Sequence, residues 1–230
     1  MRQIFLDTET TGLDPKSGHR IIEIACMEMI NLVKTNNNFH CYVNPQRDVP
    51  IEAFRIHNIS TEFLQDKPLF KDIADDFLKF IGDSPIVIHN AAFDVKFLDF
   101  ELERIGSRKI SNNKIIDSLQ IARAKFPGSP ASLDALCRRF NIDNTKRTYH
   151  GALIDTDLLC DVYIELMGGA QKGFGFSDND AVKNLSTSQK NNNTQKLTRA
   201  ARDQFNLDES ELLAHQEFIK KILKKNYWGY

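Results

Sequence analysis

The sequence predicts an α/β domain built on a mixed sheet that is flanked by helices, and three observations predict it. The first part of the chain is rich in Ile, Val, Phe and Tyr, in runs separated by turn residues, which is typical of strands. Segments with helical spacing then alternate with short apolar runs, as in sheets that carry helices. The continuous apolar run at residues 4–6 indicates a central strand covered on both faces.

The expected elements follow from these patterns in chain order. Five strands are expected, at residues 3–9, 20–30, 39–45, 84–90 and 113–119. Four helices are expected, at residues 67–82, 91–106, 132–140 and 151–169. In the first of these helices, for example, Phe70, Ile73 and Phe77 recur near helical spacing. Gly106 is expected to end the second helix, because glycine is common just after a helix C-terminus.

Composition indicates a soluble, globular protein of the cytoplasm. Hydrophobic residues make up 41% of the 230 residues, which is enough for a core, and the formal net charge is only -1. The overall field therefore gives no attraction for a polyanion, so that binding of nucleic acid would need local charges or bound metal. The four cysteines form no CxxC pair and are expected to be reduced. No apolar run has the roughly 18 residues of a membrane span, and we expect neither a membrane contact nor a signal peptide.

The chain is expected to contain a domain, a tether and a terminal segment. Residues 1–169 form the predicted domain. Residues 170–196 are mostly polar and rich in Asn, Ser and Lys, which is typical of a flexible linker. Residues 197–230 regain a helical pattern with an apolar stripe and terminal lysines, which predicts an amphipathic helix.

Two carboxylates stand at the end of the first expected strand. Asp7 and Glu9 are two residues apart, so that they share one face of the strand. A strand end is also simply where chains become polar, and this reading is the alternative. An acid pair on one face, directly after an apolar run, favours a functional site.

Two further acids extend the buried stripes of helices. Asp155 continues the stripe that contains Leu158, Leu159 and Val162 of the last domain helix. Asp94 does the same for the helix at residues 91–106, although an acid near a helix start is also favoured by the helix dipole.

Four inward-facing acids require neutralisation. Two carboxylates about 4 Å apart repel by about 4 kcal/mol at an effective dielectric constant near 20, so that bound cations or protons must relieve them. Oxygen ligands suit Mg²⁺ or Mn²⁺ better than zinc. Asp7, Glu9, Asp94 and Asp155 are therefore candidate ligands for two divalent cations, an arrangement that serves phosphoryl chemistry.

One histidine is placed to act as a base near these acids. His150 precedes Asp155 by five residues and does not share its helical face, which favours a position on the loop before the helix. There it could accept a proton from water near neutral pH. A surface histidine without function is the alternative, and His89, at the end of an expected strand, is the other candidate.

Three motifs together resemble a known family. The segments "DTETTG" at residues 7–12, "HNAAFD" at 89–94 and "HGALID" at 150–155 are similar to the three exonuclease motifs of the DEDDh 3′–5′ exonucleases. Their order and spacing agree over about 170 residues. The resemblance is nearest to the DnaQ type, the proofreading epsilon subunits of bacterial DNA polymerase III.

The resemblance implies a fold, a reaction and residue roles. The fold would be a ribonuclease H-like mixed five-stranded sheet, and the reaction would be hydrolysis of the 3′-terminal phosphodiester of DNA by a two-metal mechanism. Asp7, Glu9, Asp94 and Asp155 would bind the metals and His150 would be the general base. Within "IEAFRIHNIS", Glu52 and His57 would contact the 3′-terminal nucleotide of a single strand, together with Asp7, Glu9 and Asp155.

The resemblance also implies two protein partners. The polymerase III alpha subunit would bind the terminal helix through the stripe that includes Leu212, Ile219 and Leu223. The sliding clamp would bind "QKGFGF" at residues 171–176 through Gln171, Phe174 and Phe176. In the alternatives, the helix folds back on the domain and the two rings pack on the last domain helix.

Two other functions are compatible with parts of the pattern. One is a stand-alone DEDDh exoribonuclease, which has the same motifs but needs no tether or terminal helix. The other is a non-catalytic adapter between polymerase and clamp, which the intact acids and His150 argue against.

Overall fold

The computed structural model describes residues 1–145, 147, 149–168, 210, 213–214 and 217. The chain divides into two units, Met1–Phe176 and Ser177–Tyr230. Four residues of the second unit are described, and all four are helical and exposed: Ser210, Leu213, Ala214 and Glu217. The predicted linker and partner-binding positions lie outside the described residues: Gln171, Phe174, Phe176, Leu212, Ile219 and Leu223.

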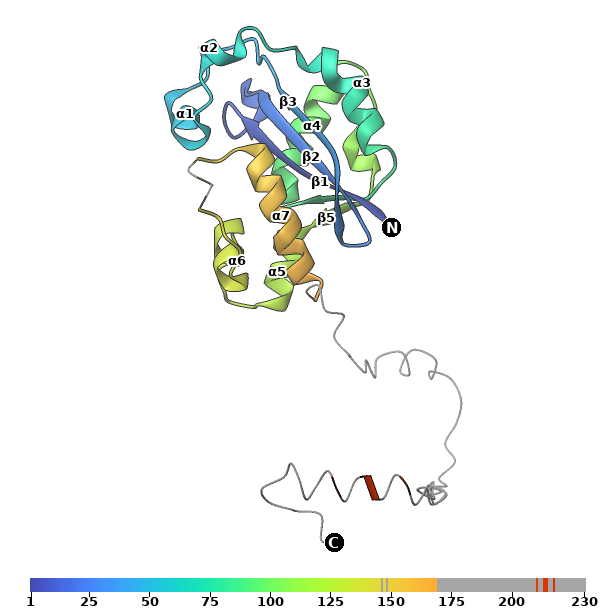
Figure 1. Cartoon of the computed structure of the whole chain (residues 1–230). Coiled ribbons are helices and arrows are strands. Elements are labelled where there is room, and N and C mark those ends of the chain that lie inside the picture. Colours follow the sequence, from blue (N-terminus) through green and yellow to red (C-terminus); the bar gives the residue numbers. More distant parts are fainter. Residues whose placement is uncertain (146, 148, 169–209, 211–212, 215–216, 218–230) are drawn as a thin grey trace, which may run out of the picture. The chain divides into compact units, whose positions relative to one another are not determined.

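The first unit contains one five-stranded mixed sheet in the order β3-β2-β1-β4-β5 (Figure 1). The first three strands of the chain pair in antiparallel fashion, and β4 and β5 extend the sheet in parallel with β1. Their bounds are β1 Arg2–Thr10, β2 Ile21–Ile30, β3 Val33–Tyr42, β4 Ile86–Ile88 and β5 Ile115–Asp117. This arrangement places β1 in the interior of the sheet, as its continuous apolar run predicts.

Helices cover both faces of this sheet. The α-helices are α1 Ile51–His57, α2 Thr61–Leu64, α3 Phe70–Ile81, α4 Ala91–Arg104, α5 Ser118–Lys125, α6 Leu133–Phe140 and α7 Ala152–Leu166. Short 3-10 turns lie at Pro15–Ser17 and Ile110–Asn112. The helices α3 and α4 pack on one face, and α5, α6 and α7 pack on the other (Figure 1).

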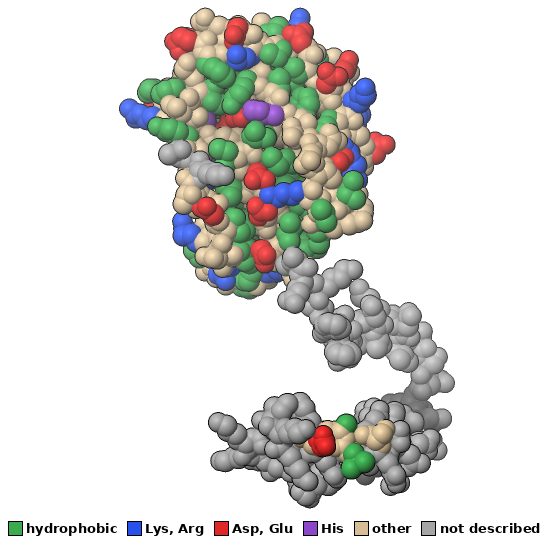
Figure 2. Space-filling view, in the orientation of Figure 1, with side chains coloured by type: hydrophobic (Ala, Val, Ile, Leu, Met, Phe, Trp, Pro, Cys, Tyr) green, Lys and Arg blue, Asp and Glu red, His purple; other side chains and the backbone are tan. Residues whose placement is uncertain are grey.

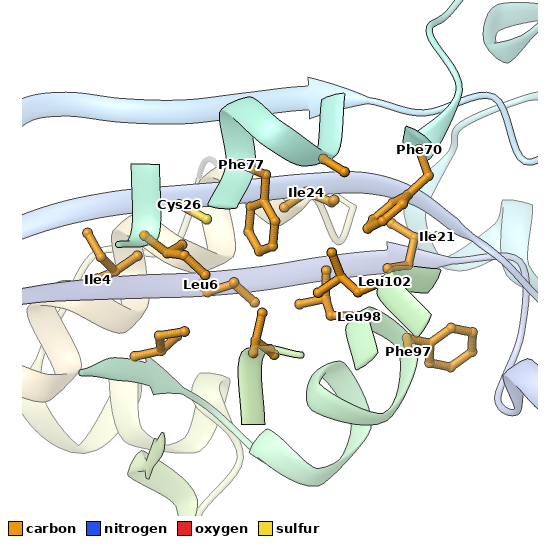
Figure 3. Packing of buried hydrophobic residues seen from close by; sticks show 14 of the residues in the cluster. Ile4, Leu6, Ile21, Ile24, Cys26, Phe70, Phe77, Phe97, Leu98 and Leu102 are labelled. Atoms are coloured by element: carbon orange, nitrogen blue, oxygen red, sulfur yellow. The ribbon is translucent and has the colours of Figure 1, made fainter. Parts of the chain in front are cut away.

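The two core clusters follow the alternation of side chains along β1. Ile4 and Leu6 point into the cluster beneath α3 and α4, which also contains Phe77 and Leu98 (Figure 3). Phe5 points the other way, into the cluster beneath α7. Because every second residue shares a face, Asp7 and Glu9 continue the row that Phe5 begins, on the α7 face. The hydrophobic pattern of β1 thus fixes the direction of its two acids.

The structure contains three helices that were not expected from the sequence. These are α1, α2 and α5, all of which have eight residues or fewer. The helix α5 begins directly after β5, because the Asp117 side chain accepts a hydrogen bond from the Leu119 backbone N–H at 2.9 Å and caps the helix. The strand expected at residues 113–119 therefore ends at Asp117.

The third strand is longer toward its N-terminus than expected and ends earlier. It spans Val33–Tyr42, and the asparagines at residues 36–38 are part of it. Asparagine is unusual in strands, but β3 lies at the sheet edge, where polar side chains reach solvent. The N-terminal part of β3 was not predicted, because it is polar and the strands were identified by their apolar runs.

Gly106 lies just past α4 with φ of 70°, as expected for the glycine that follows this helix. The four cysteines are free thiols. Among the residues that the structure describes, no helix has the length and apolar character needed to cross a membrane.

Candidate active site

Asp7 and Glu9 lie near the C-terminal end of the interior strand β1. Asp7 and Glu9 are both partly buried, and they pair with Ala25 and Glu23 of the neighbouring strand β2. The register between β1 and β2 shifts directly after Glu9. The strand therefore presents both carboxylates on the α7 face just before its pairing becomes irregular.

The third acid comes from the opposite face of the sheet. Asp94 lies in the first turn of α4 and is 3% exposed. Its Oδ1 atom accepts hydrogen bonds from the Thr8 backbone N–H at 3.0 Å and the Thr8 hydroxyl at 2.7 Å. Thr8, which lies between Asp7 and Glu9, thus fixes Asp94 at the same end of β1.

The fourth acid lies in the first turn of α7. Asp155 is 5% exposed, and its two oxygens accept hydrogen bonds from Nε and Nη2 of Arg147, the second at 2.6 Å. Arg147 also donates to Asp134 Oδ1 at 2.7 Å, so that one guanidinium joins two carboxylates. A metal ion bound to Asp155 would compete with Arg147 for these two oxygens.

His150 lies on the loop before α7, as the sequence predicts. Its imidazole is half exposed, and Nδ1 lies 3.4 Å from Asp155 Oδ2 and 2.7 Å from Arg147 Nη2. The His150 backbone N–H donates to the carbonyl of Ile56 at 3.1 Å, which ties the loop to α1. Ligand atoms of Glu9, His150 and Asp155 all lie within 4.8 Å of one another.

A cleft of about 540 Å³ joins these groups. It is lined by the four predicted acids and His150, together with Thr8, His89, Asn90, Arg123, Asp134 and Arg147. Figure 2 shows acidic side chains beside a histidine on the face drawn, with apolar side chains around them. The cleft thus brings the residues of all three sequence motifs to one place.

A second cleft adjoins the first and holds the two predicted nucleotide-contacting residues. It has a volume of about 570 Å³, is mainly apolar, and shares Glu9 and Phe93 with the first cleft. Glu52 and His57 both line it. Nε2 of His57 is buried and makes no hydrogen bond of normal geometry among the described residues, although the ring interacts with the backbone of Thr10.

The acids of the first cleft hold their protons to different degrees. Burial, and then repulsion by Asp94 and Glu9, raises the pKa of Asp7 well above its usual value. Burial and repulsion by Asp155 raise the pKa of Glu9 to about 8, and burial raises that of Asp94 to about 7 despite its hydrogen bonds from Thr8. Burial also acts on Asp155, but hydrogen bonds from His150 and Arg147 outweigh it and lower its pKa.

Sequence comparison identifies the family. The exonuclease family model, RNase_T, matches residues 4–163, which include every residue of the three motifs. DNA polymerase III subunit epsilon of Rickettsia conorii is 54% identical over 231 residues, which cover 99% of each chain. The same subunit of Escherichia coli K12 is 44% identical over 97% of this chain and 94% of its own. The chain belongs to the exonuclease family of the DNA polymerase III epsilon subunits. The exonuclease predicted from the motifs is confirmed.

Solved structures of exonucleases share the fold. Exonuclease X in complex with 5′ overhanging duplex DNA aligns with a TM-score of 0.58 at 27% identity, over 72% of this chain and 90% of its own. Escherichia coli exonuclease I in complex with single-stranded DNA aligns with a TM-score of 0.64 at 17% identity, over 73% and 41%. These structures confirm the predicted mixed five-stranded fold.

The donor set of the first cleft fits the divalent cations on which this family depends. Four carboxylates supply hard oxygen ligands, and three of them have raised pKa values because they are buried and repel one another. A divalent cation would replace the protons that otherwise neutralise these acids.

The sequence patterns missed Arg147, which contacts both Asp155 and His150. Its position gave a weak indication, because Arg147 lies only three residues before His150, on the same expected loop. A basic residue on a loop is usually solvated, however, and nothing in the pattern distinguishes this one. The bond from Thr8 to Asp94 was equally hidden, because it depends on how β1 and α4 meet in space.

Proposed function

We propose that this exonuclease removes the 3′-terminal nucleotide of single-stranded DNA with two divalent cations, Mg²⁺ or Mn²⁺, as the proofreading subunit of a replicative polymerase. The convergence of Asp7, Glu9, Asp94, Asp155 and His150 on one cleft carries the proposal. Relatives named as polymerase III epsilon subunits over nearly their full length support the replicative role.

In the proposed reaction, Asp7, Glu9, Asp94 and Asp155 hold the cations. When bound, the cations supply Lewis-acid activation of a water molecule and stabilisation of the departing oxygen. Water attacks the last phosphorus atom, the bond from phosphorus to the 3′ oxygen breaks, and a nucleoside 5′-monophosphate leaves. His150 accepts the proton that the water loses. The strand that remains ends in a new 3′ hydroxyl.

The ring contacts of His150 define which nitrogen can act as the base. Nδ1 faces Asp155 and Arg147, which leaves Nε2 for the water. For Nε2 to accept a proton, Nδ1 must carry one. The Nδ1–H group can then donate a hydrogen bond to Asp155. Arg147 always carries its donor protons, so it must leave Nδ1 in the reacting enzyme. The same movement would also free Asp155 oxygens for metal.

The terminal nucleotide is proposed to occupy the second cleft. Glu52 and His57 are placed there, beside an apolar wall that includes Ala53, Ile56 and Phe93. An apolar cleft with few polar groups is typical of a site for a flat, partly apolar ligand such as a base.

The test of the proposed function is release of mononucleotides from matched oligonucleotides. The full chain is incubated with Mn²⁺ or Mg²⁺ and single-stranded DNA or RNA labelled at the 5′ end. Stepwise shortening of DNA from the 3′ end, faster than that of RNA and abolished by a chelator, is expected. Faster shortening of RNA would favour the stand-alone exoribonuclease, and no shortening of either would favour the adapter.

The two protein partners are proposed from the same relationship. We infer that residues 197–230 bind the polymerase alpha subunit through Leu212, Ile219 and Leu223, and that Gln171, Phe174 and Phe176 bind the sliding clamp. Residues 1–169 would form the catalytic domain and residues 170–196 the tether. Short motifs on a tether benefit from a raised effective concentration once the polymerase is in place.

Full-length variants separate the two contacts. Charged substitutions at Leu212, Ile219 and Leu223 should abolish capture of alpha, while Phe174→Ala with Phe176→Ala should weaken only clamp binding. Both variants should degrade free single strands at the unchanged rate. Retained capture of alpha by the first variant, or a Tm lowered by several degrees in the second, would contradict the assignment concerned.

A further inference from the structure

A fifth carboxylate lies beside the active site and has no role in the proposed chemistry. Glu23 is in the apolar strand β2 and is only 2% exposed. It pairs with Glu9 in the register of β1 and β2, so that two acids lie directly opposite each other. Like charges in this position destabilise a sheet. A buried acid here therefore requires compensating contacts.

Two contacts occupy the two oxygens of Glu23. Oε2 accepts a hydrogen bond from the Ala152 backbone N–H at 3.1 Å, and Oε1 lies 2.7 Å from Nε2 of His40 on β3. Ala152 is the first residue of α7, where backbone N–H groups have no partner within the helix. The residue at the N-cap is Gly151, which has no side chain to offer. A carboxylate from β2 thus provides the cap that the helix itself lacks, and the helix dipole favours its charge.

Ala152, whose backbone N–H donates to Glu23, lies in the sequence between His150 and Asp155. Ala152 is fully buried, two residues after His150 and three before Asp155. One turn further along, the Thr156 hydroxyl donates to the carbonyl of Ala152 at 2.6 Å and lies 3.4 Å from that of Ala25 on β2. The contact from Glu23 therefore holds the start of α7 against the strand that pairs with β1.

We propose that Glu23, supported by His40, is a positioning residue that sets the start of α7, and with it His150 and Asp155, against the acids of β1. The inference rests on the proposed roles of His150 and Asp155. Glu23 is a cap on the adjoining helix and touches no reacting atom. His40 holds the carboxylate from the edge strand, and its own ring packs edge-on against Tyr42 at a centroid distance of 5.0 Å.

The consequence for catalysis follows from the sensitivity of reactions to geometry. A displacement of about 1 Å in a catalytic group can lower a rate by about 10²-fold. Loss of the Glu23 cap frees the start of α7 to shift or fray, because no side chain of its own helix replaces that hydrogen bond. The rate of the bound complex should therefore suffer more than the binding of substrate.

The test compares Glu23→Ala with Glu23→Gln in the full chain. Glutamine keeps an oxygen that can accept the Ala152 N–H but removes the charge, whereas alanine removes both. At saturating Mn²⁺, Glu23→Ala should lower kcat by about 10- to 100-fold, with KM for a single-stranded oligonucleotide changed by less than about 3-fold. Glu23→Gln should recover most of the lost kcat.

Hydrogen exchange supplies a second readout that does not depend on activity. Glu23→Ala should speed exchange of the Ala152 amide, while Glu23→Gln should leave it protected. His40→Asn should lower kcat and speed Ala152 exchange as Glu23→Ala does, but by less. It replaces Glu23→Ala as the test variant if Glu23→Ala does not fold. Glu28→Ala is the matched control, because Glu28 lies on the same strand and pairs with Arg2 at 2.6 Å. It should leave both kcat and Ala152 exchange unchanged.

Two outcomes would overturn the proposal. If Glu23→Ala lowered Tm while the folded enzyme kept the normal kcat, Glu23 would be only a structural cap. If both Glu23 variants lost activity equally and both recovered it at higher metal concentration, Glu23 would act through charge on metal affinity. Failure of the proposed function can be told apart from failure of the Glu23 proposal. Unchanged activity in Asp155→Asn would reject the metal site, whereas the exchange rate of the Ala152 amide in the Glu23 variants would still report on the cap.

Discussion

The two sides of the active-site cleft hold their carboxylates in different ways. On the sheet side, Asp94 receives hydrogen bonds from the neutral Thr8, and the pKa values of Asp94 and Glu9 are raised to about 7 and about 8. On the α7 side, hydrogen bonds from His150 and the cationic Arg147 lower the pKa of Asp155 despite its burial.

The difference means that repulsion between carboxylates is concentrated on the sheet side of the proposed metal site. Asp7, Glu9 and Asp94 lie close together on the sheet side, and the side chain that donates to Asp94 is the neutral Thr8. Bound protons therefore neutralise much of their charge near pH 7. The α7-side acid is already balanced by Arg147. Metal binding should therefore release protons from the sheet side and displace Arg147 on the α7 side.

The largest effect is expected from removing an acid on either side. Asp7→Asn and Asp155→Asn should each reduce hydrolysis of single-stranded DNA to the background of the assay, because each removes a proposed metal ligand. The fold should persist in both, and loss of a repelling acid should slightly stabilise metal-free Asp7→Asn.

Asp157→Asn is the matched control for the α7 side. Asp157 lies two residues after Asp155 on the same helix, is about half exposed, and pairs with Lys34. It should retain normal turnover. Near-normal turnover of Asp7→Asn or Asp155→Asn in Mg²⁺ would disprove the metal-ligand assignment.

The next effect is expected from the proposed base. His150→Gln should lower kcat by about 10²- to 10⁴-fold, which is the usual contribution of a general base. The defect should shrink at high pH, where hydroxide forms without help. Measurement of kcat from pH 6 to 10 checks this, with His89→Gln as the control from the same cleft. An unchanged pH profile in His150→Gln would move the base elsewhere, with His89 next in line.

A smaller effect is expected on the stability of the metal-free protein. Raised pKa values mean that Glu9 and Asp94 stabilise the folded state below their unfolded pKa near 4, and that this contribution is lost as pH rises through about 8 and about 7. Tm of the metal-free chain should thus fall by roughly 5 °C or more between pH 5 and 9. Asp155, with its lowered pKa, should contribute nothing to this decline.

Calorimetry of the Glu9→Gln variant supplies the comparison. Its Tm should depend less on pH over the same range, because one of the titrating acids is gone. A Tm that rises from pH 5 to 9 in the unmodified metal-free chain would show that the sheet-side acids do not hold protons.

The sequence predicted β1 and β4 well because both carry uninterrupted apolar runs. The run at residues 4–6 gave both the position of β1 and its burial on two faces. The short helix α1 was missed, since seven residues hold fewer than two turns of pattern. The polar strand segment at residues 36–38 was missed because only its place at the sheet edge makes it tolerable.

The candidate site was predictable where one element breaks its own pattern. Asp94 and Asp155 each stand where an apolar stripe would continue, and a reader of the sequence can see that. The partners of these acids, Thr8 and Arg147, could not be predicted, because each contact joins elements that meet only after folding. Glu23 gave a signal as an acid in an apolar strand, but its bond to Ala152 depends on the docking of α7.

The most direct test of the account is the count of protons released when metal binds. Calorimetric titration of the metal-free chain with Mn²⁺ at pH 7, in two buffers of different ionisation enthalpy, yields that number. Release of at least about one proton is expected at pH 7, with a smaller release for Glu9→Gln. Metal binding at pH 7 without proton release, or with the same release in Glu9→Gln, would contradict it.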